Sequence, residues 1–475
     1  MVLPGFLGPT YTERSLSIDA QRCINLFPVL DPTGKESVAL VGTPGLRLAG
    51  SLVSQQPVRG LHTDYQYIYA VIGNTFYHMT ASYQIINSWA LFTTQGRVYM
   101  EHNNNNQLCI VDGINLYTYN TSTLALFQNP ANVLTNPTSV CFIDQFFVIS
   151  GTSGANTQAM QSSAVNDGTT WSALAINFAA ADPDPLLGVK NVHRLLYAFG
   201  AITTEIWYDA GLINFPFQFS SNVIDYGTHS FATVATVSDT VTWLARDATG
   251  GRQVVMAQGY GVQIISTPAL EQEWAKYNTV ADAFAFAYQY EGSSFYVITF
   301  PSAGTTYAYD TRTQLWHQRA SLGVGYWRPN SYCLFNDLHI VGDSQDGDLY
   351  IIDANTFTDS GTAIERIRSC PHIWNDRKEL FFKRLQVDFE SGVGLSVPVN
   401  NQGVTPQAQL RWSNDGGKTW GNYHSAPIGP QGAYKTRSIW RTLGHSRDRV
   451  FEVSTSEPCK IAMVGASVEL TQGVI

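Results

Sequence analysis

The feature that most constrains the fold is a β-hairpin pattern that recurs between residues 55 and 370. Its clearest copy spans residues 305–318, where Tyr307 and Tyr309 lie two apart and share one face of a strand. Asp310 then begins a turn, because its short carboxylate can bond the backbone two residues further on. The turn residues of the seven copies are Thr80, Asn120, Asn166, Asp209, Ser266, Asp310 and Asp353.

The spacing of these seven turns, about 40 to 57 residues, predicts the architecture. A period in the forties with β patterns alone is typical of a β-propeller, in which each repeat forms one four-stranded blade. The sequence therefore predicts an all-β fold with a seven-bladed propeller, and six blades is the alternative. A large β-protein whose hairpins are evenly spaced by chance is the other interpretation.

Composition agrees with a large, well-buried β-protein. Of the 475 residues, 12% are aromatic, 14% are charged and 39 are glycine. The formal net charge is −9, which argues against a protein that grips DNA by neutralising its phosphates. A lumen through which DNA passes without adhering stays compatible with this charge.

The chain divides into three predicted parts. Residues 1–50 lie outside the repeat and begin with several Pro and Gly residues, which predicts an extended N-terminal arm. Residues 51–372 carry the propeller. In residues 373–475 apolar and polar residues alternate, with joins rich in Gly, Pro and Asn, and this pattern predicts a C-terminal antiparallel β-sandwich.

The N-terminal arm holds apolar residues, Leu26 and Phe27 among them, that are costly to leave in water. A closed propeller has little core to receive them, because each blade already packs against its neighbours. We therefore expect residues 1–35 to pack at a contact with a neighbouring subunit or ring and to be mobile in the free monomer. A strand from 38 to 48, interrupted by a type II turn at residues 43–45, is a candidate to complete the first or last blade.

Residues 413–420 match the Asp-box pattern S-x-D-x-G-x-T-W in full, and residues 166–171 match it in part. We interpret the full box as a structural hairpin turn in which the carboxylate accepts turn amides, a glycine adopts a conformation closed to other residues, and the indole fixes the turn to the core. The residues that define it are Ser413, Asp415, Gly417, Thr419 and Trp420. The box is typical of sialidase propellers, so a sialidase-like or carbohydrate-binding protein is the alternative function, although no Arg-Ile-Pro motif accompanies it.

No other pattern with catalytic chemistry is present. The six cysteines are scattered and form no CxxC or CxxH pair, so the sequence predicts neither a metal site nor a redox centre. Nucleophile-elbow, zinc-protease and nucleotide-binding motifs are missing, which predicts a protein that is not an enzyme and has no cofactor. The first residues do not resemble a secretory signal, and the apolar runs are too short to insert into a membrane.

One short segment of this acidic chain concentrates four arginines: Arg437, Arg441, Arg447 and Arg449. Nearby acidic residues allow the simple interpretation of a solvated strand face. The functional interpretation is a contact with an acidic partner or a neighbouring subunit, because arginine pairs with carboxylates through two parallel hydrogen bonds.

Three stretches of the chain carry a family resemblance. They are Asn25-Leu26-Phe27-Pro28 with Gly34-Lys35 and Thr43-Pro44-Gly45-Leu46; Gly96-Arg97-Val98 through His102 to Asp112-Gly113; and Ile439-Trp440-Arg441 to Val453 with Ala462 to Leu470. In these stretches the chain resembles the tail-hub proteins of short-tailed, podovirus-type bacteriophages, also called packaged-DNA stabilisation or head-completion proteins. The similarity covers most of the chain, and each motif is short.

The resemblance implies a non-catalytic structural protein of the virion tail. It implies a ring of six copies, assembled in the bacterial host cytoplasm and attached below the portal and adaptor rings. Such a hub closes the DNA exit channel, stabilises the packaged DNA until ejection, and anchors tail fibres or spikes and a tail needle or tip. DNA is then only a weakly held passenger. A propeller that serves as a protein-interaction scaffold is the third class of function considered.

Overall fold

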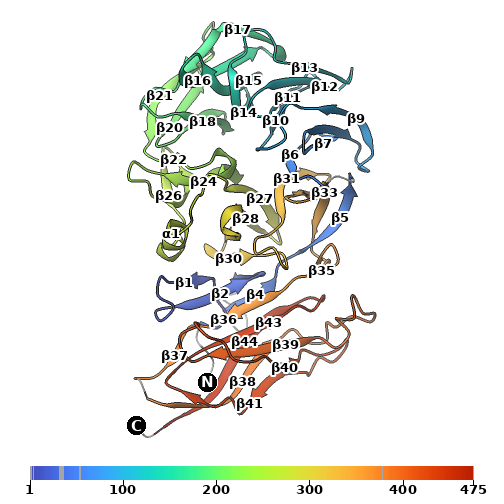
Figure 1. The fold of residues 1–475 in the computed structure, drawn as a ribbon, viewed down its shortest axis with the longest axis vertical. Coiled ribbons are helices and arrows are strands. Elements are labelled where there is room, and N and C mark those ends of the chain that lie inside the picture. The colour runs from blue at the N-terminus through green and yellow to red at the C-terminus, as the bar shows by residue number, and fades with distance from the viewer. Residues whose placement is uncertain (1–2, 4, 31–36, 53–54, 377, 474–475) are drawn as a thin grey trace.

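The computed structural model describes residues 3, 5–30, 37–52, 55–376 and 378–473. Seven antiparallel blades surround a common centre, and a β-sandwich lies beside them (Figure 1). The predicted all-β propeller followed by a β-sandwich is confirmed, and the described residues form seven blades rather than six.

The first four blades each use four consecutive strands, which run in order from the axis to the rim. Blade 1 consists of β6 (Val58–Thr63), β7 (Ile68–Ile72), β8 (Thr75–Met79) and β9 (Ile85–Ala90). Blade 2 consists of β10 (Tyr99–His102), β11 (Gln107–Val111), β12 (Leu116–Asn120) and β13 (Ala125–Gln128). Blade 3 consists of β14 (Thr135–Ile143), β15 (Phe146–Ser153), β16 (Asn156–Ala164) and β17 (Asp167–Phe178). Blade 4 consists of β18 (Leu186–Val192), β19 (Leu195–Gly200), β20 (Thr204–Asp209) and β21 (Phe217–Ile224).

The remaining three blades depart from this simple pattern. Blade 5 has a divided inner strand, β22 (Gly227–Thr228) and β23 (Ala235–Val237) around the 3-10 helix η1 (Phe231–Thr233), and then β24 (Thr240–Arg246), β25 (Gln253–Gln258) and β26 (Gly261–Ile264). Blade 6 consists of β27 (Phe284–Tyr290), β28 (Ser293–Phe300), β29 (Thr305–Asp310) and β30 (Leu315–Arg319), with η2 at Pro301–Ala303. Blade 7 consists of β31 (Pro329–Phe335), β32 (Leu338–Asp343), β33 (Asp348–Asp353) and β5 (Gly45–Ser51), with the small strands β34 (Thr358–Asp359) and β35 (Thr362–Ala363).

The fifth hairpin turn lies elsewhere than the sequence pattern indicated. Ser266 follows β26, the outer strand of blade 5, whereas the turn between β25 and β26 lies at Gly259 and Tyr260. Most of the apolar run at residues 262–266 belongs to this outer strand and does not precede a hairpin turn. The corrected turn makes the repeat more regular, because the turns on either side are then about 50 residues away.

An N-terminal strand closes the propeller. β5 pairs with β33 in antiparallel register, with Leu46 opposite Ile352 and Ser51 opposite Asp348. The predicted type II turn at residues 43–45 is not formed, because Gly45 begins β5 in extended conformation. Glycine is required at position 45 for another reason: a Cβ there would lie 2.4 Å from the carbonyl oxygen of Thr358.

Two sheets form the sandwich. One contains β3 (Leu26–Leu30), β4 (Val38–Gly42), β44 (Ala462–Gln472), β38 (Leu380–Phe389), β41 (Ser438–Arg441) and β42 (His445–Ser446). The other contains β1 (Tyr11–Thr12), β2 (Ala20–Ile24), β36 (Arg366–Ser369), β37 (Ile373–Trp374), β43 (Asp448–Thr455), β39 (Gln407–Ser413) and β40 (His424–Pro427). A parallel pairing of Ile24 with Gln318 joins this second sheet to blade 6.

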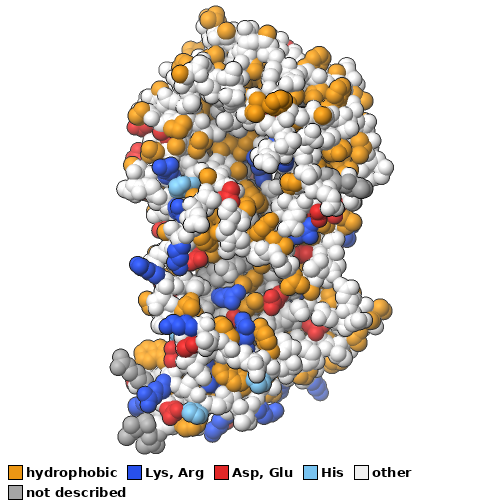
Figure 2. All heavy atoms as spheres, in the orientation of Figure 1, with side chains coloured by type: hydrophobic (Ala, Val, Ile, Leu, Met, Phe, Trp, Pro, Cys, Tyr) orange, Lys and Arg blue, Asp and Glu red, His pale blue; other side chains and the backbone are white. Residues whose placement is uncertain are grey.

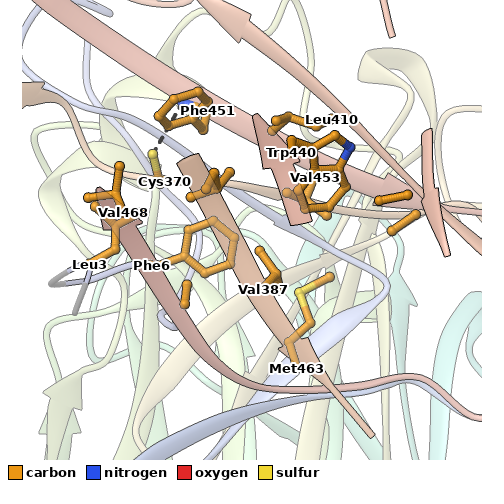
Figure 3. Packing of buried hydrophobic residues seen from close by; sticks show 14 of the residues in the cluster. Leu3, Phe6, Cys370, Val387, Leu410, Trp440, Phe451, Val453, Met463 and Val468 are labelled. Atoms are coloured by element: carbon orange, nitrogen blue, oxygen red, sulfur yellow. Dashed lines mark hydrogen bonds between the residues drawn. The ribbon is translucent and has the colours of Figure 1, made fainter. Parts of the chain in front are cut away.

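The expectation of a separate N-terminal arm that packs on another subunit is wrong for the described residues. β1 to β4 are strands of the sandwich, and Leu3 and Phe6 lie in its core beside Val468 and Val387 (Figure 3). Only residues 1–2, 4 and 31–36 of the predicted arm lie outside the described part. The apolar residues of this segment are buried in the sandwich, because β1 to β4 complete the two sheets that the C-terminal strands begin.

The Asn25-Leu26-Phe27 motif joins the two domains. Asn25 has a left-handed backbone (φ 53°), and its side-chain amide donates to the carbonyl oxygens of Ala320 (2.9 Å) and Glu365 (2.8 Å). The next two side chains point to different cores: Leu26 lies in the sandwich core, and Phe27 packs on Phe295 with ring centroids 5.4 Å apart. The left-handed residue therefore reverses the chain between the propeller and the sandwich.

The single α-helix among the described residues is α1 (Pro268–Ala275), between blades 5 and 6. Its eight residues are far fewer than a bilayer crossing requires. Thr267 caps its first turn, and Trp274 buries completely against blade 6, so the helix fills the wedge between two blades.

Candidate functional site

The Asp box forms a closed turn after β39. Asp415 Oδ1 accepts hydrogen bonds from the backbone N–H groups of Lys418 (3.0 Å) and Thr419 (2.9 Å), and its Oδ2 accepts the Thr419 hydroxyl (2.6 Å). The hydroxyl oxygen of Ser413 accepts the N–H of Gly417 (2.8 Å), whose φ of +90° favours glycine. These bonds show that the carboxylate acts as the acceptor that closes the turn.

This turn supports the N-terminal loop. A Cβ on Gly416 would lie 3.5 Å from the carbonyl oxygen of Leu16, and one on Gly417 would lie 3.3 Å from the Cβ of Ala20. His372 adds a second link, because its Nδ1 lies 2.8 Å from an Asp448 carboxylate oxygen and its Nε2 lies 2.7 Å from the Leu16 carbonyl oxygen. Sequence patterns gave no signal for His372. The Asp box lies in the sandwich rather than in a propeller blade, so it does not support the sialidase-like alternative.

The Trp420 indole is only half-buried. The Arg411 guanidinium lies over its ring, with Cζ 4.8 Å from the centroid, and Arg411 Nε also donates to the buried Glu452 (2.7 Å). Trp420 is therefore linked to the sandwich through an arginine that is itself paired with a buried carboxylate.

Asp415→Asn is expected to lower the melting temperature of the sandwich, because an amide replaces the ionised acceptor of four hydrogen bonds. Hydrogen bonds from Ser413, then Thr419 and Lys418, hold the pKa of Asp415 well below its ordinary value of 3.8. A carboxyl with a lowered folded-state pKa stabilises the fold above its unfolded-state pKa and loses this effect as the pH falls further. The gap between wild type and variant in thermal melts should therefore be full at pH 7 and shrink below about pH 4. Asp225→Asn is the control, since Asp225 is exposed and its side chain makes no hydrogen bond within the described chain. A constant gap at all pH values would contradict this prediction.

The partial box at residues 166–171 links blades 2 and 3. Gln107 donates through Nε2 to Asp167 (3.1 Å) and accepts the N–H of Gly168 (2.9 Å). Burial opposes ionisation of Asp167, but hydrogen bonds led by those from Thr169 outweigh it and lower the pKa to about 2. Through these hydrogen bonds the turn holds blades 2 and 3 together.

The structure separates the four arginines of the basic segment. Arg437, Arg441 and Arg447 are exposed on the sandwich. Arg441 lies opposite Arg384 of β38, which is paired with Glu469 (Nε–Oε2 3.7 Å). Arg449 is only 1% exposed, donates to the Leu443 carbonyl (2.6 Å) and lies over the Phe382 ring.

Three predicted contact residues are therefore unavailable to a partner. Arg449, Leu26 and Phe27 are buried in this chain's own cores, at 1%, 0% and 3% exposure. The alternation of apolar and polar residues along a strand could not predict that Arg449 is buried, because β43 is covered on both faces. Arg437, Arg441 and Arg447 stay as candidate contacts.

A surface with the opposite character lies at the far end of the molecule. No Lys or Arg occurs between Arg97 and Lys190, a stretch that forms blades 2 and 3. In Figure 2 the charged side chains gather over the lower half, and the upper part is mostly apolar or uncharged. The outer strands of blades 1 to 3 and the β20–β21 loop carry exposed apolar side chains, which we call the apolar rim: Ile85, Ile86, Trp89, Phe92, Phe127, Leu174, Phe178, Leu212 and Ile213.

Two parts of the apolar rim differ in shape. On one side, β9 is an edge strand whose residues are almost all exposed, with Trp89 at 40% and Phe92, just after it, at 67%. On the other side, a groove of about 450 Å³ lies between blades 3 and 4 and is lined by Phe146, Ala175, Leu212, Ile213 and Pro216 among others. An exposed apolar edge strand is a site where another chain can add, so β9 is the stronger marker of association.

The propeller axis holds two cavities. The entrance cavity, of about 720 Å³, lies where the inner strands begin and is lined by residues of all seven blades. The inner cavity, of about 300 Å³, lies further along the same strands. Arg97, Tyr99 and Phe231 line both cavities, and the Tyr99 and Phe231 ring centroids are 5.3 Å apart across the axis. These side chains narrow the axis, so it is no passage for duplex DNA.

Titratable groups are present in the inner cavity. Burial raises the pKa of Glu101 to about 7, and the charge of Lys190 opposes this shift. The His62 Nε2 and His102 Nδ1 atoms lie 2.8 Å apart, and burial lowers the pKa of His62 to about 3. Within the described ranges, no group of three His, Cys, Asp or Glu side chains is placed to hold a metal ion.

Comparison with protein families decides the identity of this two-domain chain. Residues 3–357 match the Phage_stabilise family, described as the β-propeller of bacteriophage P22 Gp10, and residues 365–471 match the β-sandwich of the same protein. The chain belongs to the P22 Gp10 family. It is a structural phage protein of the tail-hub and head-completion type, which confirms the resemblance inferred from the sequence motifs. As a Gp10-family protein it is a component of the virion tail.

Other comparisons add little to the Gp10 assignment. No curated protein matches the sequence. A catalytically inactive virginiamycin B lyase from Staphylococcus aureus with quinupristin is 8% identical, with a TM-score of 0.46 over 65% of this chain and 99% of that one. The Neurospora crassa Pan2 WD40 domain is 8% identical, with a TM-score of 0.42 over 66% of this chain and 94% of that one. Similarities at this level carry no argument about activity.

Proposed function

We propose that this Gp10-family protein is the hub of a short phage tail and has no catalytic role. The observation that carries the proposal is the match of both domains, in order, to the P22 Gp10 models. Six copies form a ring below the portal and adaptor rings in the host cytoplasm. The ring closes the DNA exit channel, stabilises the packaged DNA, and anchors the tail fibres or spikes and the needle or tip.

The apolar rim supports self-association into a ring. A closed ring needs two different faces on each subunit, so that one face of a copy meets the other face of the next. β9 and the groove between blades 3 and 4 are such a pair, because one projects apolar side chains and the other is a hollow with apolar walls. Both are part of the charge-poor end of the propeller (Figure 2).

The exposed arginines support a contact of another kind. Arg437, Arg441 and Arg447 lie on the sandwich and suit an acidic surface of an adaptor or portal protein. In this arrangement the propeller rims form the ring and the sandwiches carry the charged contact to the neighbouring ring.

The hub assignment is tested by mixing the purified protein with its portal and adaptor rings and measuring mass by light scattering. We expect a discrete complex with a fixed number of copies per portal ring. A protein that stays monomeric and does not bind these rings would overturn the proposal.

Duplex DNA is expected to bind the isolated protein weakly. The chain has a net charge of −9, and its propeller has no Lys or Arg between residues 98 and 189 to follow a phosphate backbone. Fluorescence anisotropy at physiological salt should give a Kd weaker than the range of about 10⁻⁶ to 10⁻⁴ M that is typical of non-specific binders. A high affinity for duplex DNA that decreases steeply with salt concentration would contradict the proposal that the channel holds DNA only weakly.

A further inference from the structure

The entrance cavity of the propeller contains a cation without an anionic partner. Tyr99 and Glu101 lie in β10, Arg97 lies two residues before this strand, and all three line the axial cavities. Within the described chain, no carboxylate lies within ion-pair distance of Arg97. Its side chain is partly exposed to the cavity, and burial among neighbouring residues lowers its pKa.

One nitrogen of Arg97 holds the guanidinium in place. Nη1 donates to both the carbonyl oxygen (2.7 Å) and the side-chain oxygen (2.6 Å) of Asn330, and Cζ lies 5.6 Å from the Phe284 ring centroid. Nε and Nη2 have no hydrogen-bond partner among the described residues. This free edge carries the two parallel N–H donors that a carboxylate accepts in bidentate geometry.

Arg59 adds positive charge but no free donor. It is 3% exposed and donates to the carbonyl oxygens of Gly73, Thr93, Gln95 and Gly96 and to the Thr93 hydroxyl. These bonds fix the loop that precedes Arg97. Among the described residues that line the entrance cavity, Asp282 is the one acidic residue, and its Oδ2 accepts the N–H of Ser302 (2.9 Å).

The other residues that line the cavity indicate the chemical character of a ligand that would fit it. Tyr99, Phe231 and Phe284 supply aromatic surface, and Gln56, Gln95 and Asn330 supply amides at the polar edge. A volume of about 720 Å³ lies within the usual range for small-molecule sites. We infer that this cavity binds an organic carboxylate with an apolar body, and that the carboxylate pairs with the free Nε–Nη2 edge of Arg97.

A carboxylate fits this site better than a phosphate. The single free guanidinium edge matches a planar monoanion, whereas a dianion would need further donors that Arg59 has already used. The same chemistry is found in a free carboxylic acid and in the C-terminal residue of a peptide. The residues that line the cavity belong to one chain, so the site can be tested on the full-length chain alone.

Titration calorimetry with N-acetylphenylalanine and N-acetylphenylalaninamide tests the inference on the full-length protein. The two probes differ only in the carboxylate, so the acid should bind about tenfold or more tightly than the amide, the scale of a charge-assisted pair. Equal affinity of the two probes, or no binding of the acid, would overturn the inference. Competition by an equal concentration of inorganic phosphate would also overturn it.

Variants locate the site. Arg97→Gln should remove the preference for the acid, and Arg97→Lys should keep the charge but lose most of the preference, because an ammonium has no planar fork. Arg437→Gln, on the exposed sandwich surface, is the matched control and should change nothing. Thermal melts verify folding; if Arg97→Gln does not fold, the lysine variant decides. Unchanged preference in the lysine variant would overturn the role of Arg97.

A second pair of probes distinguishes the sources of the carboxylate. Acetyl-Gly-Gly-Gly-Phe is compared with its C-terminal amide. Binding of the tetrapeptide acid at least as tight as that of N-acetylphenylalanine would support the inference with a chain end as ligand. Binding of the small acid alone would support it with a free acid as ligand.

Discussion

A lysine on the apolar rim is expected to abolish ring assembly and leave the subunit folded. The substitutions are Phe92→Lys beside β9, and Leu174→Lys and Ile213→Lys beside the groove. These side chains are 67%, 72% and 101% exposed, so a lysine can extend into solvent in the free subunit, and the free energy of unfolding should change by no more than about 0.5 kcal/mol. In a ring contact the same lysine would be buried without a partner, which costs about 2–5 kcal/mol at each interface.

Light scattering with the portal and adaptor rings measures this effect, and thermal melts verify the fold. Tyr65→Lys is the matched control, because Tyr65 is an equally exposed apolar residue (96%) in the turn between β6 and β7, outside the apolar rim. The control should assemble as the wild type does. Normal assembly of all three rim variants would show that the ring uses another surface.

Local patterns predicted the propeller because each blade is built from local hairpins. Asp310 illustrates this: it ends β29, its Oδ1 accepts the N–H of Arg312 (2.9 Å), and β30 returns after four residues. Every contact needed to form such a turn lies within the repeat. The fifth repeat was misplaced because its outer strand, β26, has the same apolar character as the strands that precede a turn.

Long-range pairing limited the prediction at the N-terminus. β5 completes blade 7 from about 300 residues away, and β2 to β4 complete both sandwich sheets. Pattern alone identified the apolar residues of this segment and the need to bury them. It could not identify the surface that buries them, and a neighbouring subunit was a reasonable candidate as long as the sandwich was thought to be complete.

The functional surfaces were partly hidden for the same reason. The four arginines of the basic segment are equivalent in sequence, yet a two-sided core surrounds Arg449 and solvent surrounds Arg441. The apolar rim is also invisible to patterns, since an exposed Trp89 and a buried Trp243 occupy similar strands. Arg97 belonged to a motif of the family resemblance, but its position on the axis follows only from closure of all seven blades.

Deletion of residues 1–30 is expected to prevent folding of the sandwich, rather than to leave a folded subunit that fails to assemble. The deletion removes β1 to β3 and takes Leu3, Phe6, Cys23 and Leu26 out of the core. For comparison, Phe6→Ala alone should destabilise the sandwich by about 3–5 kcal/mol, because it leaves a cavity in a close-packed core.

A buried arginine makes the loss greater than the missing apolar area suggests. Arg368 is 0% exposed and donates to the carbonyl oxygens of Gly5, Phe6, Pro9 and Arg22 and to the side chain of Gln21, all within residues 1–30. Without this segment a buried guanidinium loses all these acceptors, which is among the most costly defects a core can contain.

The measurement is limited proteolysis with near-ultraviolet circular dichroism of the truncated chain. Residues 365–475 should become protease-sensitive, whereas the propeller retains β5 and can still close blade 7. Ile18→Ala is the control within the deleted segment, because its side chain is 69% exposed and the substitution should change stability by less than about 0.5 kcal/mol. A truncated protein with an intact, protease-resistant sandwich would contradict this prediction, since the acceptors of Arg368 would then have to be replaced by other groups.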